Sequence, residues 1–232
     1  MKYIVQYGAM RALGVFTHAE LILHQGNQVI VKTHRGQEAG MVRCEANQEN
    51  IQKLDKEFVQ GQIIRLMTEA DEIECQQLQK LEQGKLEGCQ KIVQDLGIAM
   101  KLVRVEHTFG GERIIIYYTA EGRIDFRELV KVLVGEYQLR VEMRQINARE
   151  EMKVLHVIGD CGREVCCGCF LRETPGISIK MAKLQKVTLE PAKISGHCGR
   201  LKCCLRYEYD CYVDKKAEDK VSENKQSGFC DS

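Results

Sequence analysis

Cysteine is the residue type in this sequence with the clearest capacity for chemistry. The 232 residues include twelve cysteines, and eight of them fall between positions 161 and 211. Six of the eight belong to two loops that repeat the pattern Gly-x-Cys-Gly-Arg-x-x-Cys-Cys-x-x-aromatic at a constant offset of 37 residues. The first loop contains Cys161, Cys166 and Cys167, and the second contains Cys198, Cys203 and Cys204. The chain therefore carries an internal repeat of a cysteine loop.

The spacing within each loop bears on the kind of metal that it suits. Thiolates are soft ligands for zinc and for iron–sulfur clusters. Structural zinc sites usually take cysteines two to four residues apart, whereas each loop places them at positions i, i+5 and i+6. The one Cys-x-x-Cys, from Cys166 to Cys169, occurs only in the first loop, so it is weak support for zinc. Adjacent cysteines fit different corners of a cluster, or two sites, better than one small tetrahedral ion.

Glycine and arginine follow the first cysteine of each loop. Gly162 and Gly199 allow the backbone to turn and direct N–H groups at a cluster sulfur, while Arg163 and Arg200 can neutralise cluster charge. The loops therefore predict metal or cluster binding. Two other interpretations stay open: a reduced, buried cysteine core, and a thiol redox sensor with a low-pKa exposed cysteine.

Composition and charge indicate the compartment of the protein and the electrostatic surroundings of the cysteines. There is no run of 18 apolar residues and no signal-peptide pattern at the N-terminus, so we expect a cytoplasmic protein. In that compartment clustered cysteines serve metal binding or redox chemistry more often than structural disulfides. Residues 161–206 carry nine basic and three acidic side chains, an excess that could offset metal-bound thiolates or face nucleic acid.

The sequence outside the loops predicts the elements that must position them, and together these elements make an α+β fold. Short strands broken by turns predict a small β-barrel or sheet in residues 1–65, and apolar periodicity predicts a long acidic helix in residues 66–100, as a connector or a partner face. Two strands around a Gly-Gly turn, a helix and another strand then make a β-β-α-β unit, which we group with the cysteine loops as a domain from 101 to 211. We expect a disordered tail in residues 212–232.

The two main helices carry more detailed predictions. The helix that follows the hairpin should begin at Asp125, in a capping box with Glu128, and stop near Gly135. The long acidic helix should bury a narrow apolar stripe that comprises Ile73, Leu78, Leu81, Cys89, Val93 and Leu96.

Outside the loops, few residues indicate chemistry. Arg140 and Arg144 alternate outward on the last strand, with Arg149 just beyond, and they could contact phosphates or form a solvated strand face. The sequence shows no P-loop, no nucleophile–base pair and no paired carboxylates, so we expect no catalytic activity from this chain alone.

Three segments carry a resemblance to a known family: residues 155–167, which end in the first cysteine loop, residues 178–183, and residues 191–205, which include the second loop. They resemble the C-terminal domain of the bacterial YaaT/RicT family, which is related to a yeast polymerase-suppressor protein. The resemblance covers most of residues 26–210, and its double Cys-Gly-Arg-x-x-Cys-Cys signature is highly specific.

This resemblance implies a non-enzymatic subunit of a three-protein complex with small helical proteins of the YlbF/RicF and YmcA/RicA types. In such complexes cysteines of the subunits hold four-iron four-sulfur (4Fe-4S) clusters. The complex acts as a specificity factor for the membrane-associated endoribonuclease RNase Y, promotes maturation of polycistronic mRNA, and influences sporulation, competence and biofilm formation. On the matching positions, the implied ligands are Cys161, Cys166, Cys167, Cys198 and Cys203, with Cys204 next. Cys169 is an extra ligand or a bystander.

One further interpretation remains beside the redox sensor: a nucleic-acid-binding module with structural zinc. Its phosphate contacts would come from Arg140, Arg144, Lys180, Lys183 and Lys186. The fourteen aromatic residues show no pattern of a base-stacking platform, which weakens direct single-strand recognition. Direct RNA contact stays open.

Overall fold

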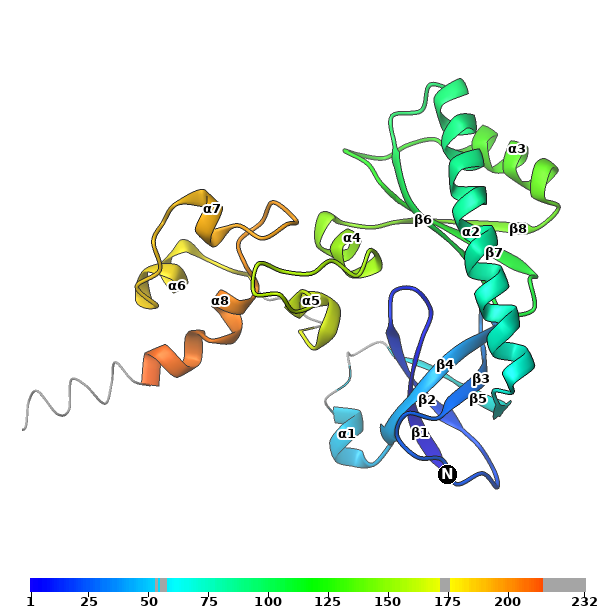
Figure 1. The fold of residues 1–232 in the computed structure, drawn as a ribbon, viewed down its shortest axis with the longest axis horizontal. Coiled ribbons are helices and arrows are strands. Elements are labelled where there is room, and N and C mark those ends of the chain that lie inside the picture. The colour runs from blue at the N-terminus through cyan, green and yellow to red at the C-terminus, as the bar shows by residue number, and fades with distance from the viewer. Residues whose placement is uncertain (53, 55–57, 172–175, 215–232) are drawn as a thin grey trace, which may run out of the picture. The chain divides into compact units, whose positions relative to one another are not determined.

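The structure, a computed structural model, describes residues 1–52, 54, 58–171 and 176–214 (Figure 1). The chain divides between Asn147 and Ala148 into two compact units. The barrel and the three-stranded sheet both lie in the first unit, whereas the cysteine loops lie in the second. The sheet thus groups with the barrel and not with the loops, unlike the domain from 101 to 211 that we expected. The reason is long-range packing, since this sheet shares a buried polar network with the barrel.

Five strands form a closed barrel in the order β1-β2-β5-β3-β4. Their bounds are β1 Lys2–Tyr7, β2 Ala12–Thr17, β3 Gln28–Thr33, β4 Gly36–Glu45 and β5 Val59–Leu66, with the short helix α1 Gln48–Gln52 between the last two. The core includes Val5, Phe16, Val29, Val31 and Val42. Closure brings β2 and β5 together as a parallel pair, in which Gly61 lies opposite Phe16. A Cβ on Gly61 would lie 2.3 Å from the Lys32 carbonyl oxygen, so the barrel closes only with glycine there.

Helix α2, Glu69–Asp95, is the long acidic helix that the sequence predicts. Thr68 and Asp71 form a capping box at its start, and Arg65 pairs with the Asp71 carboxylate. Cys89 and Val93 of the predicted stripe are buried, but the side chains of Ile73 and Leu81 are each 56% exposed. The stripe is therefore only partly covered. The reason is that the buried apolar residues of α2 pack on the sheet only toward the C-terminal end of the helix.

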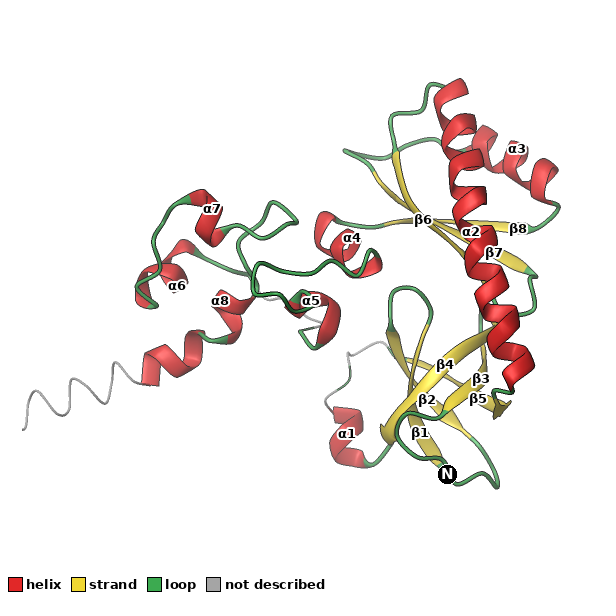
Figure 2. Ribbon diagram, viewed as in Figure 1, coloured by secondary structure: helices red, strands yellow, loops and turns green. Residues whose placement is uncertain are grey.

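The second sheet has the predicted β-β-α-β order. Strands β6 Lys101–His107 and β7 Arg113–Thr119 are antiparallel, and β8 Arg140–Gln145 pairs parallel to β7 after helix α3 Arg127–Tyr137. Helices α2 and α3 pack on one face of this sheet, where their buried residues meet those of the strands (Figure 2).

The predicted ends of α3 are wrong. Asp125 does not form a capping box: its carboxylate accepts from the N–H of Arg127, only two residues on, and the helix begins at Arg127. Gly135 lies inside the helix, and the left-handed residue that ends it is Gln138, with φ of 54°. Tertiary packing of the last turn, where Tyr137 contacts α2 through Cys89, extends the helix past the glycine.

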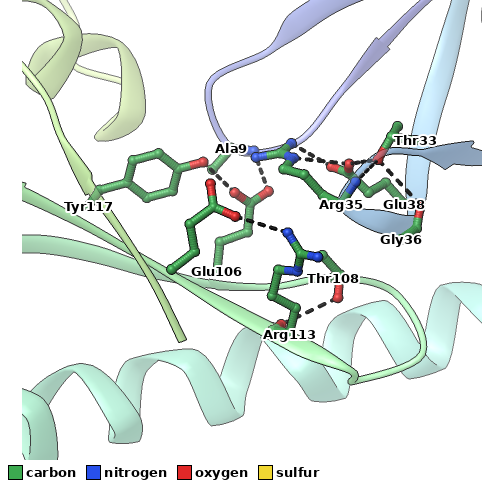
Figure 3. A network of polar contacts seen from close by, with 10 residues as sticks. Ala9, Thr33, Arg35, Gly36, Glu38, Glu106, Thr108, Arg113 and Tyr117 are labelled. Carbon is green, nitrogen blue, oxygen red and sulfur yellow. Dashed lines mark hydrogen bonds and ion pairs between the residues drawn. The ribbon is translucent and has the colours of Figure 1, made fainter. Parts of the chain in front are cut away.

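A buried polar network joins the barrel to the sheet within the first unit (Figure 3). The Glu106 carboxylate accepts from the Ala9 N–H at 2.6 Å and from the Tyr117 hydroxyl at 2.5 Å. Arg35, beside it, pairs with Glu38 at 2.6 Å. Burial raises the pKa of Tyr117, helped by the nearby Glu106 carboxylate, so the hydroxyl stays protonated and donates.

The second unit consists of short helices and the two cysteine loops. The helices are α4 Ala148–Val154, α5 Cys166–Cys169, α6 Ile179–Leu184, α7 Pro191–Ile194 and α8 Cys204–Tyr207. A small core of Ala182, Ile194 and Leu205 holds the last three helices together. The sequence predicts a disordered tail from residue 212, but residues 212–214 are helical; the rest of the predicted tail, from position 215 on, lies outside the described residues. No helix in the described ranges is long and apolar enough to span a membrane.

Candidate metal centre

The two cysteine loops have the same backbone structure. In the first, the Gly159 N–H donates to the Arg163 carbonyl at 2.8 Å, and in the second the Gly196 N–H donates to the Arg200 carbonyl at the same distance. The glycine after the first cysteine adopts a positive φ in both loops, 76° at Gly162 and 71° at Gly199. The sequence repeat is therefore a structural repeat of a tight hairpin, and each turn relies on the conformational freedom of glycine.

The loops face each other through equivalent residues. Asp160 and His197 occupy the same position in the repeat, and the side chains lie 3.2 Å apart. Phe170 and Tyr207 are also equivalent, and their rings meet edge to face with centroids 4.8 Å apart. Contacts between equivalent residues are what an approximate two-fold axis produces. The Lys202 ammonium, 2.6 Å from the Asp160 carboxylate, adds an ion pair between the loops.

All six repeated cysteines line one cavity of about 150 Å³. They are Cys161, Cys166, Cys167, Cys198, Cys203 and Cys204. Cys167 is buried and Cys161 is exposed, while the other four are intermediate. Cys169 and Cys211 are both exposed and are not among the residues of the cavity wall. The fold thus brings together every cysteine of the repeat and leaves Cys169 outside.

Hydrogen bonds between the loops polarise the inner thiols. The Cys167 thiol donates to the Cys203 sulfur, which lowers the pKa of Cys203 to about 5 and raises that of Cys167. Burial and the nearby sulfur of Cys203 raise the pKa of Cys166 to about 11. This contact therefore favours the thiolate form of Cys203 over that of Cys167. Because metals bind thiolates, loading the remaining cysteines would release protons.

Arginines contribute to the site in a different way from the sequence prediction. Arg163 does contact Cys161: a hydrogen bond from its backbone N–H, and its charge, lower the pKa of that thiol. Arg163 and Arg200 are both exposed, and neither is part of the cavity wall. Arg149, which we had grouped with the phosphate candidates Arg140 and Arg144, instead lines the cysteine cavity. No local pattern could have shown this, because Arg149 lies twelve residues before the first cysteine.

The cysteines surround a space and do not converge on one point. Within the described residues, no three His, Cys, Asp or Glu side chains form a group that could hold a single metal ion. His107, His156 and His197 are the histidines nearest the loops in sequence, and of these only His197 lines the cavity. Its Nε2 contacts the Asp160 carboxylate.

Comparisons with known proteins match both units. Residues 61–146 match the family model described as the PSP1 C-terminal conserved region, and residues 176–219 match the third domain of PSP1-like proteins. The chain is 45% identical over 190 residues to Stage 0 sporulation protein YaaT of Bacillus subtilis. The aligned residues make up 82% of this chain and 68% of that protein. An uncharacterised protein of Schizosaccharomyces pombe is 26% identical over 168 residues, or 61% of this chain and 22% of that protein. No solved structure matches.

Proposed function

The chain belongs to the family of PSP1-domain proteins that includes Stage 0 sporulation protein YaaT, and we propose that it is a non-enzymatic, iron–sulfur-binding subunit of a regulatory complex with a role in sporulation. The observation that carries the proposal is the single cavity of about 150 Å³ lined by six cysteines from two facing loops.

The donor set fits a cluster. A cavity of about 150 Å³ is large enough for a molecule of the size of benzene, and so for a compact group of several atoms. Adjacent cysteines such as Cys166 and Cys167 can serve different corners of such a group. Thiolate sulfur is the usual protein ligand of iron–sulfur clusters.

Each loop would make two kinds of contribution. Its cysteines would hold the cluster, with Cys161, Cys166, Cys167, Cys198 and Cys203 as the principal ligands and Cys204 as a sixth candidate. The chain around them keeps the cysteines in place: the hairpins fix the first cysteine of each loop, and the contacts of Asp160 with His197 and Lys202 hold the loops against each other. When bound, an iron–sulfur cluster would bridge the loops and could take up an electron.

The role of the subunit would be to bind partners and not to catalyse. We propose helical partners of the YlbF and YmcA types, and action of the complex as a specificity factor for RNase Y in mRNA maturation, with effects on sporulation, competence and biofilm formation. The exposed apolar side chains of Ile73 and Leu81 on α2 support a partner surface in the first unit, because apolar surface left exposed can mark a protein interaction site.

Anaerobic purification tests the proposal. The chain is purified alone and together with the two presumed partners, and iron, acid-labile sulfide and zinc are measured with a visible spectrum. We expect iron and sulfide in near-equal amounts and brown absorption. Cys203→Ser, which removes a sulfur from the cavity wall, should abolish both, whereas the matched control Cys169→Ser, outside the cavity, should retain them.

Two results would overturn the proposal. Stoichiometric zinc without sulfide, both alone and in the complex, would favour a zinc-stabilised module. Full assembly with the partners by Cys203→Ser, despite loss of iron, would separate the cysteine site from complex formation.

A further inference from the structure

We propose that Arg149 is a positioning residue for the cysteine site: its side chain clamps the second loop to helix α4, beside the first loop, and places a positive charge next to the sulfurs. The charge part of this inference rests on the proposed cluster, whereas the clamp can be tested without it.

Arg149 touches both loops. It lies in the first turn of α4, and the Cys167 thiol of the first loop approaches its carbonyl oxygen at 4.0 Å. Its guanidinium Nη2 donates to the carbonyl oxygen of Leu201, in the second loop, at 3.2 Å. Leu201 lies two residues before Cys203 and forms the closing bridge of its hairpin with Ser195. One side chain therefore connects the helix beside Cys167 to the backbone that carries Cys203.

Arg149 and Lys202 are both cations of the cavity wall. Lys202 lies 2.6 Å from the Asp160 carboxylate of the first loop. Arg149 lines the same cavity as Cys167 and Cys203, so its positive charge lies near the sulfurs that would hold a cluster. Arginine stays protonated at all relevant pH values, so this charge is permanent. A permanent cation beside the sulfurs should also favour the more negative, reduced state of a bound cluster.

Two substitutions separate the clamp from the charge. Arg149→Met removes both, whereas Arg149→Lys keeps the charge but loses the planar fork that reaches the Leu201 carbonyl. Arg140→Met, at an exposed position on strand β8 of the other unit, is the matched control. The full chain is used as purified, and circular dichroism confirms that each variant is folded.

Hydrogen exchange measured by mass spectrometry tests the clamp. We expect the amides of residues 196–204 to exchange about tenfold faster in Arg149→Met and in Arg149→Lys, because a lost hydrogen bond to a charged donor costs enough to shift a local equilibrium by that factor. Arg140→Met should leave this segment unchanged. Unchanged exchange in Arg149→Lys refutes the clamp, even if Arg149→Met does not fold.

A redox titration of the loaded protein tests the charge. In Arg149→Met we expect a midpoint potential more negative by about 59 mV, a tenfold change in the equilibrium for one electron, with Arg149→Lys close to wild type. An unchanged potential in Arg149→Met refutes the charge role. If the wild-type chain holds no cluster, the proposed function fails, and the exchange experiment still decides whether Arg149 clamps the loops.

Discussion

The turn glycines of the two loops give a sharp test of the structural repeat. Gly162 and Gly199 have φ of 76° and 71°, and a Cβ at either position would meet no atom within 4 Å. Substitution by alanine therefore adds no clash and costs only the left-handed backbone conformation, about 1–2 kcal/mol. We expect each substitution to raise the local exchange rate of its own hairpin about 5- to 30-fold, since 1.4 kcal/mol corresponds to a factor of ten.

Each loop also offers a matched control. Gly159 and Gly196 start the same hairpins without a positive φ, and an added Cβ would make contacts no closer than 3.5 Å and 3.6 Å, which are ordinary distances. Gly159→Ala and Gly196→Ala should therefore change exchange by less than about threefold, as for a surface substitution within about 0.5 kcal/mol. The assay is native-state hydrogen exchange of residues 157–167 and 194–204.

Two outcomes would contradict this reasoning. If Gly162→Ala exchanges like Gly159→Ala, the hairpin does not depend on a left-handed glycine. If Gly162→Ala and Gly199→Ala differ by much more than the expected range, the two loops are not equivalent, and the two-fold relation inferred from Asp160 and His197 fails with them.

Two further predictions concern the first unit. Tyr117→Phe leaves the buried Glu106 carboxylate without its hydroxyl donor, so the free energy of unfolding in urea should fall by about 1.5–3 kcal/mol. Tyr118→Phe, on the other face of the same strand, is the control. If both variants lose the same free energy of unfolding, the hydrogen bond to Glu106 has no special role. His107 lies buried beside the Lys85 ammonium at 2.7 Å, and burial, reinforced by that cation, lowers its pKa to about 4. Because the unfolded chain takes up a proton on this histidine near pH 6.5 and the folded chain does not, stability should fall as pH drops from about 6.5 to 4. His107→Gln should flatten that part of the urea-midpoint profile, and an unchanged slope would contradict the assignment.

Much of the architecture follows from local sequence. Short strands broken by turns predict the barrel, and Phe109-Gly110-Gly111 predicts the hairpin of β6 and β7, because strand patterns and positive-φ glycines act over a few residues. The same holds for the repeat of the cysteine loops, whose identical hairpin bonds reflect identical local sequence. The predicted ends of α3 were wrong because a contact between distant segments also decides where this helix ends. Packing of Tyr137 against Cys89 extends the helix past Gly135, and the residues at the helix ends do not reveal that contact.

The sequence by itself determined which cysteines form the repeat and that the loops would turn at Gly162 and Gly199. Only the tertiary structure decided that the six thiols share one cavity, that Cys169 lies outside it, and that Arg149 lines it. The first set depends on residue type and spacing, which act through the local backbone. The second depends on how α4 and the two hairpins pack, and side chains far apart in sequence meet only once that packing is complete.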